Sequence, residues 1–291
     1  MDIHGFEAKV IEDTRWGESR LTTLQLRYPR LIHSEFMTHR VFSRNASSSR
    51  AIPVKKIIEQ VLSKPAMPIH WGKNVSGMQA KEELSPVDCL HAMDLWNIAA
   101  KDAAKTATEM MNLGLHKQVA NRILEPFQFM NVIVTSSKWT NFFELRDHPD
   151  ADPNICHLAK HMKRAMEEHE PRRVAFDDTR NALFHLPYVS TEEREQLTVS
   201  VLAKISAARC ARVSYLTHDG ENPVIEKDLE LYERLVGSAP MHASPVEHQA
   251  KALVREEEIN GRNMSGNFDK YWGQFRKYIE VGEPQEFWQT S

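Results

Sequence analysis

The sequence has few cysteines and no paired ones. Cys89, Cys156 and Cys210 lie far apart, and no C-x-x-C pair occurs in the 291 residues. This spacing argues against a disulfide framework or a zinc knuckle, and it is typical of proteins from a reducing compartment. We therefore expect a cytoplasmic protein whose cysteines serve as small buried hydrophobic residues.

No segment of the chain suits a membrane or a secretion signal. The N-terminus, MDIHGFEAKV, has no basic stretch followed by an apolar run, and no stretch is long and apolar enough to span a bilayer. The formal net charge is −3, from 37 basic and 40 acidic residues, whereas proteins that bind nucleic-acid polymers are usually strongly basic. We expect a small-molecule ligand as partner, and neither a membrane nor a nucleic-acid polymer.

Three widespread motifs are also missing. The sequence contains no G-x-G-x-x-G, no G-x-x-x-x-G-K-[ST] and no G-x-S-x-G. A Rossmann dinucleotide fold, a P-loop and an α/β-hydrolase nucleophile therefore have no support in the sequence.

What is present is a series of helical patterns with a few strands between them. Leu24 and Leu26 fall on one face of a predicted strand over 19–28, which Pro29 ends. Residues 129–134, FMNVIV, suit either a buried strand or a further helix, since periodicity does not separate the two. The spacing of apolar residues predicts helices over 31–41, 54–63, 87–113, 115–124, 139–146, 153–169 and 224–237. The mixture indicates an α+β fold in a single domain over residues 1–291.

The densest polar cluster of the chain lies at residues 38–50. It contains three arginines, one histidine and four serines. Residues 45–49 are mostly short hydroxyl and amide side chains, which compete for backbone hydrogen bonds and so predict a loop. Arginine forks match phosphate oxygens, and serine hydroxyls and loop N–H groups add further donors. The cluster is therefore either a binding loop for a small phosphate-bearing ligand or a solvated, serine-rich surface loop.

The same segment resembles the signature of the flavin-dependent thymidylate synthases. In that family it reads R-H-R, two residues, S, one residue, N-E, one residue, S, one residue, R; here it reads T-H-R-V-F-S-R-N-A-S-S-S-R. The family's first arginine is replaced by Thr38 and its glutamate by Ala46. The matching residues are His39, Arg40, Ser43, Asn45, Ser48 and Arg50.

Two later segments are similar to the same family. Residues 114–122, followed by Pro126, look like the family's helix that ends A-R-x-x-x-P, whose arginine reaches the nucleotide phosphate. The resemblance gives that role to Arg122. The run NFFELR is similar to N-F-x-x-L-R, whose asparagine contacts flavin and whose arginine contacts the nucleotide. The resemblance therefore assigns Asn141 to the flavin and Arg146 to the nucleotide.

A fourth similarity is out of order along the chain. Residues 208–215 look like the R-A-A-R-V-S-F strand near the family's N-terminus, and residues 242–248 look like the flavin-binding H-x-T-P-F-E-H that follows it. In the family both precede the arginine signature, whereas here both follow it by more than 150 residues. We predict a permuted arrangement, in which residues 201–250 supply the block that opens the family's fold and residues 260–291 add a helical tail.

The resemblance implies a thymidylate synthase fold with helices packed on a small antiparallel sheet. Its reaction would transfer a one-carbon unit from methylene-tetrahydrofolate to C5 of dUMP, with FAD as cofactor and NADPH as reductant, in a homotetramer whose sites form between subunits. The substrate-binding residues would be Glu35, Ser48, Ser49, Arg50, Arg122 and Arg146, with Ser48, Arg50 and Arg146 at the reacting atoms. The flavin would lie against His39, Arg40, Asn141, Ser214, His242, Ser244, Glu247 and His248.

The departures at Thr38 and Ala46 keep two other hypotheses open. The first is an enzyme on the same scaffold that hydroxymethylates a pyrimidine nucleotide or methylates dCMP. The second is a nucleotide-binding homologue without catalytic activity. Product analysis and the presence of bound flavin separate these hypotheses from a thymidylate synthase.

A histidine pair on one predicted helix is the remaining candidate for chemistry. His157 and His161 are spaced i, i+4, which suits a metal site. No glutamate follows the first histidine as in H-E-x-x-H, and the basic residues Lys160, Lys163 and Arg164 surround the pair. We expect no metal at these histidines.

Overall fold

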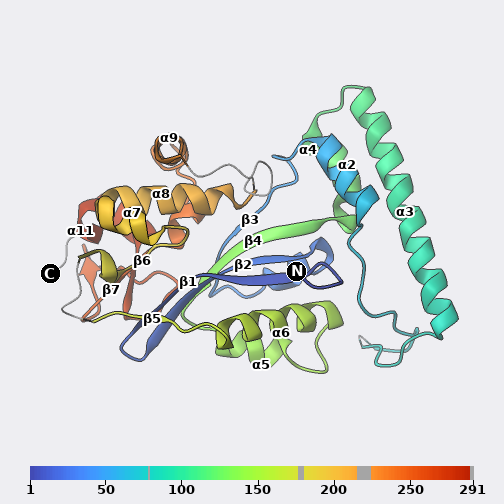
Figure 1. Cartoon of the computed structure of the whole chain (residues 1–291), viewed down its shortest axis with the longest axis horizontal. Helices are drawn as coiled ribbons and strands as arrows, with labels where there is room; N and C mark the ends of the chain where they lie inside the picture. The colour runs from blue at the N-terminus through green and yellow to red at the C-terminus, as the bar shows by residue number, and fades with distance from the viewer. Residues whose placement is uncertain (78, 176–179, 215–223, 289–291) are drawn as a thin grey trace.

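The computed structural model describes residues 1–77, 79–175, 180–214 and 224–288. At its centre is a five-stranded sheet in the order β3-β4-β2-β1-β5 (Figure 1). The strands are β1 (Glu7–Trp16), β2 (Ser19–Pro29), β3 (Ser43–Ala46), β4 (Phe129–Ser136) and β5 (Arg172–Arg173). β5 runs parallel to β1, and the other neighbours are antiparallel. The α+β class and the strand predicted over 19–28 are confirmed, and the sheet is mixed at one edge.

β4 settles the segment that sequence periodicity left open. Val132 and Val134 belong to one hydrophobic core of the sheet. Ile133, between them, packs with Cys210 and Val213 instead. This alternation of faces is the period of two that a strand imposes. The run FMNVIV is therefore a strand that is buried on both faces, and not a helix.

Two helices cover the first face of the sheet. They are α5 (Thr140–Arg146) and α6 (Pro153–Glu167), and both lie on the same side of the strands in Figure 1. α6 begins at Asp152, whose carboxylate accepts hydrogen bonds from the backbone N–H groups of Asn154 and Ile155. The buried face of α6 then presents Leu158 and Met162 to the sheet. Both helices agree with the predictions from sequence.

The C-terminal part of the chain covers the other face. Its helices are α7 (Thr191–Gln196), α8 (Val199–Ala211), α9 (Ile225–Val236), α10 (Phe275–Glu280) and α11 (Pro284–Trp288). Its strands are β6 (Phe184–His185), β7 (Ala250–Ala252), β8 (Glu258–Ile259), β9 (Arg262–Asn263) and β10 (Trp272–Gln274), of which β10, β7 and β6 form a three-stranded sheet. These elements enclose a second core around Phe184, Leu202 and Phe275. α8 and α6 thus lie on opposite sides of the central sheet (Figure 1).

A third group of helices packs beside the sheet. It comprises α2 (Val54–Ser63), α3 (Pro86–Asn112), α4 (Lys117–Ala120) and the 3-10 helix η2 (Asn121–Phe127). α3 begins after the N-cap Ser85 and ends before Gly114, whose φ of +80° suits glycine. The predicted helix over 115–124 is therefore present as two short turns, α4 and the start of η2. In the part of the chain that the structure describes, no helix is both long and apolar enough to cross a membrane.

Two predictions near the polar cluster are corrected by the structure. The helix predicted over 31–41 is shorter, since a 3-10 turn (η1, Arg30–Ile32) leads into α1 (His33–Phe36) and the helix ends there. The predicted loop over 45–49 begins with β3 instead. Ser43 to Ala46 pair with β4 at four registered positions. The free edge of β4 therefore decides the conformation of this segment, and local composition does not.

Two predictions in the C-terminal part are also corrected. The resemblance predicts a strand from residue 208, but this segment is the end of α8 followed by the 3-10 helix η4 (Arg212–Ser214). Its alanine-rich sequence favours a helix. The helical tail predicted over 260–291 first contains β9, which pairs with β8, and β10, which pairs with β7, and only then forms α10 and α11.

Candidate functional site

His39 occupies the first part of the site, between α1 and β3. This residue is 7% exposed, and its Nε2 accepts a hydrogen bond from Nε of Arg146 at 3.0 Å. Arg146, at the end of α5, also forms an ion pair with Glu35 of α1. Burial, together with the charges of Arg146 and Arg44, lowers the pKa of His39 to about 4. The imidazole is therefore neutral at pH 7 and acts as an acceptor for the arginine.

Arg44 links this histidine to the C-terminal block. Its Nη1 donates to the carbonyl oxygens of Met37 and His39, at 2.9 Å each. The carboxylate of Glu247 is close enough to stabilise the Arg44 cation, and it forms an ion pair with Arg276 of α10. Burial raises the pKa of Glu247, although Arg276 and Arg44 act in the opposite direction. The signature segment and the segment 242–248 therefore share one electrostatic group.

Asn45 makes the direct connection between β3 and this block. Its Nδ2 donates to the carbonyl oxygen of Cys210 at 2.7 Å, and its Oδ1 accepts from Oγ of Ser244 at 3.4 Å. On the same strand, Ser43 Oγ accepts from Nε2 of Gln274, which also donates to the carbonyl oxygen of Glu247. Segments about 200 residues apart in the sequence thus meet at β3. This contact supports the predicted permutation, which remains a prediction.

Glu125 organises a second group of cations at the turn after β3. Its Oε1 accepts from Oγ of Ser49 at 2.9 Å and lies 2.9 Å from Nη1 of Arg122 and 3.1 Å from Nη2 of Arg30. Asn121, fully buried at the start of η2, donates to the carbonyl oxygen of Ser49 at 2.6 Å and so holds the turn in place. Two cations and a hydroxyl thus converge on one half-buried carboxylate.

The predicted site residues therefore fall into several groups. Glu35, His39 and Arg146 are together, as are Ser49 and Arg122, and Ser244 and Glu247 lie against β3.

The other predicted site residues do not belong to these groups. Ser48 is half-buried in the turn after β3, while Arg40, Arg50, Asn141 and His242 are exposed. His248 is fully buried, and its Nδ1 is 2.8 Å from Oγ1 of Thr135 in β4. The side chain of Ser214 lies outside the described residues.

Sequence reasoning missed four charged residues of this region, of which Arg30, directly after β2, forms an ion pair with Glu125. Arg44 lies inside the signature but matches no family position, and Glu125 is one turn after Arg122. Arg276 comes from the C-terminal tail and forms its ion pair across 29 residues. The i, i+3 spacing of Arg122 and Glu125 in the sequence is typical of an ion pair on a helix, and it could have predicted their contact. The contacts of Arg44 and Arg276 were not, because they depend on tertiary packing.

A family model described as "Thymidylate synthase complementing protein" matches residues 14–172, which is more than half of the chain. The chain belongs to this family. The match covers the arginine signature, Arg122 and Arg146, and it confirms the resemblance that these segments carry. It ends before residues 208–215 and 242–248, so the order of the C-terminal block rests on the contacts at β3.

Two solved structures are similar to part of the chain. The crystal structure of a UMP/dUMP methylase PolB from Streptomyces cacaoi bound with 5-Br UMP is 18% identical, with a TM-score of 0.43, and the match covers 51% of this chain and 69% of that one. The same methylase bound with 5-Br dUMP is 17% identical, with a TM-score of 0.41 and coverages of 51% and 67%. A comparison with curated protein sequences finds no match.

Proposed function

We propose that this protein is a flavin-dependent thymidylate synthase. The reaction transfers a one-carbon unit from methylene-tetrahydrofolate to C5 of dUMP and yields dTMP, with NADPH as the reductant of FAD. The observation that carries this proposal is the meeting of the family signature with the segments 208–214 and 242–248 at β3, through Asn45 and Arg44. Family membership over residues 14–172 supplies the reaction class.

The nucleotide is proposed to bind between the two arginine groups. Arg122 and Arg146 each face a carboxylate in the structure, Glu125 and Glu35 respectively. A phosphate group carries more charge than a carboxylate and matches the arginine fork bidentately, so it competes for these cations. Arg50, exposed on the turn after β3, adds a third cation.

Two serines and an arginine are proposed to act on the pyrimidine. C5 of uracil must become nucleophilic, and negative charge then develops on the ring carbonyl oxygens. The hydroxyl of Ser48, with the cation of Arg50 or Arg146, stabilises that charge when these groups are held in place before the reaction. The hydroxyl of Ser49 donates its hydrogen to Glu125, so it would contact the nucleotide as an acceptor. The hydrogen bonds from Ser49 to Glu125 and from Asn121 to the Ser49 carbonyl oxygen restrict the turn in this way.

The donors around β3 fit a flavin dinucleotide. Arg40 is exposed and Arg44 is half-buried, which offers cations to a pyrophosphate. Ser244 and Glu247 are half-buried beside the same strand and offer a hydroxyl and a carboxylate to ribose or ring N–H groups. We propose that these residues hold FAD together with His39, Asn141, Ser214 and His242, while His248 positions the segment through Thr135. Bound FAD would supply the hydride chemistry, and the protein the orientation.

A homotetramer is proposed because α3 leaves apolar side chains uncovered. Val87, Leu90, Leu95 and Ile98 are between 54% and 74% exposed along this helix. Exposed apolar rows of this kind are typical of protein–protein contacts. Sites that form between subunits would bring a second chain to the exposed arginines. Analytical ultracentrifugation of the wild type and of Leu90→Glu tests this, and a monomeric wild type would contradict it.

Flavin binding and product identity test the proposed activity directly. The purified protein should be yellow, and NADPH should bleach its flavin absorbance. With methylene-tetrahydrofolate and dUMP, mass spectrometry should then find dTMP. A hydroxymethylated product, or turnover of dCMP in place of dUMP, would establish the alternative that the departures at Thr38 and Ala46 motivate. Nucleotide binding without flavin or turnover would establish the non-catalytic alternative.

The nucleotide assignment has its own test. Arg122→Ala or Arg146→Ala should weaken dUMP binding by roughly 2–4 kcal/mol, because each removes a charge-assisted contact. Arg255→Ala, at an exposed position outside the site, serves as the matched control. If isothermal titration finds unchanged dUMP affinity in both site variants, the assignment of these arginines to nucleotide binding is wrong.

A further inference from the structure

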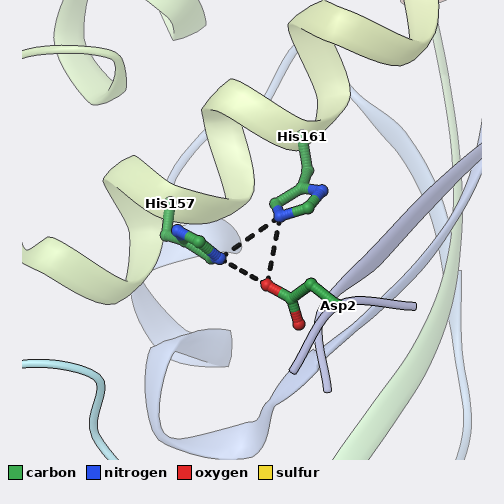
Figure 2. Close-up of side chains that lie close together, drawn as sticks. All are labelled: Asp2, His157 and His161. Atoms are coloured by element: carbon green, nitrogen blue, oxygen red, sulfur yellow. Dashed lines mark hydrogen bonds and ion pairs between the residues drawn. The ribbon is translucent and has the colours of Figure 1, made fainter. Parts of the chain in front are cut away.

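Three potential metal ligands converge where the N-terminal turn meets α6. Figure 2 shows Asp2, His157 and His161 with their ligand atoms directed at one another. Oδ2 of Asp2 lies 2.5 Å from Nε2 of His157 and 3.1 Å from Nε2 of His161, and the two nitrogens are 3.2 Å apart. Each side chain is partly buried, with an exposed fraction of 17% for Asp2, 29% for His157 and 23% for His161. The group is accessible to an ion and held by packing.

Local structure orients the three ligands before any ion binds. The histidines are one turn apart on α6 and so project from the same face. Asp2 uses its other oxygen, Oδ1, to accept a hydrogen bond from the backbone N–H of Phe6 at 2.7 Å, within a turn closed by Gly5. The Phe6 ring packs against His157 in an edge-to-face contact at 4.9 Å. A carboxylate fixed by a second hydrogen bond is the usual arrangement behind a metal ligand.

The distances match a small tetrahedral ion. Zinc–ligand bonds of about 2.0–2.1 Å place neighbouring ligand atoms about 3.3 Å apart in a tetrahedron. The contacts of 3.1 and 3.2 Å are close to this value, and the contact of 2.5 Å between His157 and Asp2 would have to lengthen for an ion to enter. Two imidazoles and one carboxylate suit Zn²⁺ better than the oxygen-seeking Mg²⁺ or Ca²⁺.

The charges around the cluster are compatible with a cation. Of the basic residues that argue against a metal, Lys163 forms an ion pair with Asp147 at 3.1 Å, and Lys160 is exposed. Arg164 still faces His161 and Arg27 faces Asp2, so these two cations weaken the site without blocking it.

We propose that Asp2, His157 and His161 form a Zn²⁺ site, with water at the fourth position. The third ligand comes from a residue 155 and 159 positions away from the two histidines, which is why the sequence alone argues against a metal. The ion would tie the N-terminal turn to α6. This site shares no residue with the proposed nucleotide and flavin site.

The test uses the full-length protein without a histidine tag, stripped with a chelator and titrated with ZnCl₂ alone. Isothermal titration should find one site, and Zn²⁺ should raise the melting temperature. His157→Gln/His161→Gln should weaken binding roughly a hundredfold or more and abolish the thermal shift. His148→Gln, at an exposed position outside the cluster, should behave like the wild type.

A second variant keeps the test informative if the double variant does not fold. Asp2→Asn retains the acceptor for the Phe6 N–H and removes the ligand charge, and it should also weaken Zn²⁺ binding. Co²⁺ in the wild type should give the intense visible bands of a four-coordinate site. No Zn²⁺ binding in the wild type, or equal affinity in the wild type and the folded variants, would overturn the proposal. Neither readout depends on flavin or turnover.

Discussion

Arg209 stabilises the C-terminal block through a buried group of ion pairs. Its side chain is 4% exposed; Nε donates to Oδ2 of Asp228 at 2.8 Å, and Nη2 donates to Oε1 of Glu193 at 2.6 Å. Nη1 donates to the carbonyl oxygen of Tyr188 at 2.7 Å. Asp228 is fully buried. Arg209→Met keeps most of the side-chain volume and removes the guanidinium, so Asp228 loses its buried hydrogen-bond partner.

The expected loss follows from the burial of the remaining carboxylate. Removing one partner of a buried ion pair costs about 3–5 kcal/mol, because the other charge stays out of water. Arg212, whose Nη1 lies 3.0 Å from Oδ1 of Asp228, continues to face that charge. We therefore expect the lower end, a decrease of about 3 kcal/mol in the free energy of unfolding. The melting temperature should fall by roughly 6–12 °C in a chain of this size.

Urea denaturation of paired variants measures this loss. Arg209→Met should lower the transition midpoint, and Arg209→Met/Asp228→Asn should regain part of the loss because the buried charge is gone. Arg255→Met, at an exposed position, is the matched control and should change little. A loss below about 1 kcal/mol in Arg209→Met, or no recovery in the double variant, would refute the reasoning.

Three further predictions concern single positions. Burial lowers the pKa of His248 to about 3, below the value of about 6.5 in an unfolded chain. The free energy of unfolding should therefore fall by roughly 1.4 kcal/mol per pH unit as the pH drops below about 6.5. In urea unfolding measured across this pH range, His248→Gln should remove that slope. Gly5→Ala should lower the free energy of unfolding by about 1–3 kcal/mol, because φ is +89° and the new Cβ would lie 2.6 Å from the Phe129 ring. An unchanged melting temperature would contradict this turn geometry. Ser190→Ala should cost about 1 kcal/mol by the same assay, since it removes the capping box with Glu193, while Ser190→Asp should retain most of the stability.

Long local patterns are predictable because they need no distant partner. α2 and α3 follow from helical spacing, and the glycine after α3 marks the end of that helix. The strand β2 follows from alternation and from Pro29. In each case the local preference and the tertiary environment agree, which is the usual condition for a correct prediction from one sequence.

Short elements depend on neighbours that a sequence does not display. β3 exists because the edge of β4 pairs with Ser43 to Ala46, against the loop preference of those residues. β10 forms because β7 is beside it. The family resemblance suggests a strand from residue 208, whereas alanine content and packing on Ile133 produce a helix over 208–211, followed by a 3-10 turn that ends at Ser214.

For the candidate site, the sequence by itself determined which residue types are present and which family they belong to. His39, Arg122 and Arg146 can be matched to positions of the family motifs from the sequence alone, since short patterns of residue types and spacings identify a family. Only the tertiary structure decided what those residues contact. Burial and charge act through space, so Arg44 with Glu247, and Asp2 with the histidines of α6, became neighbours only when the chain folded.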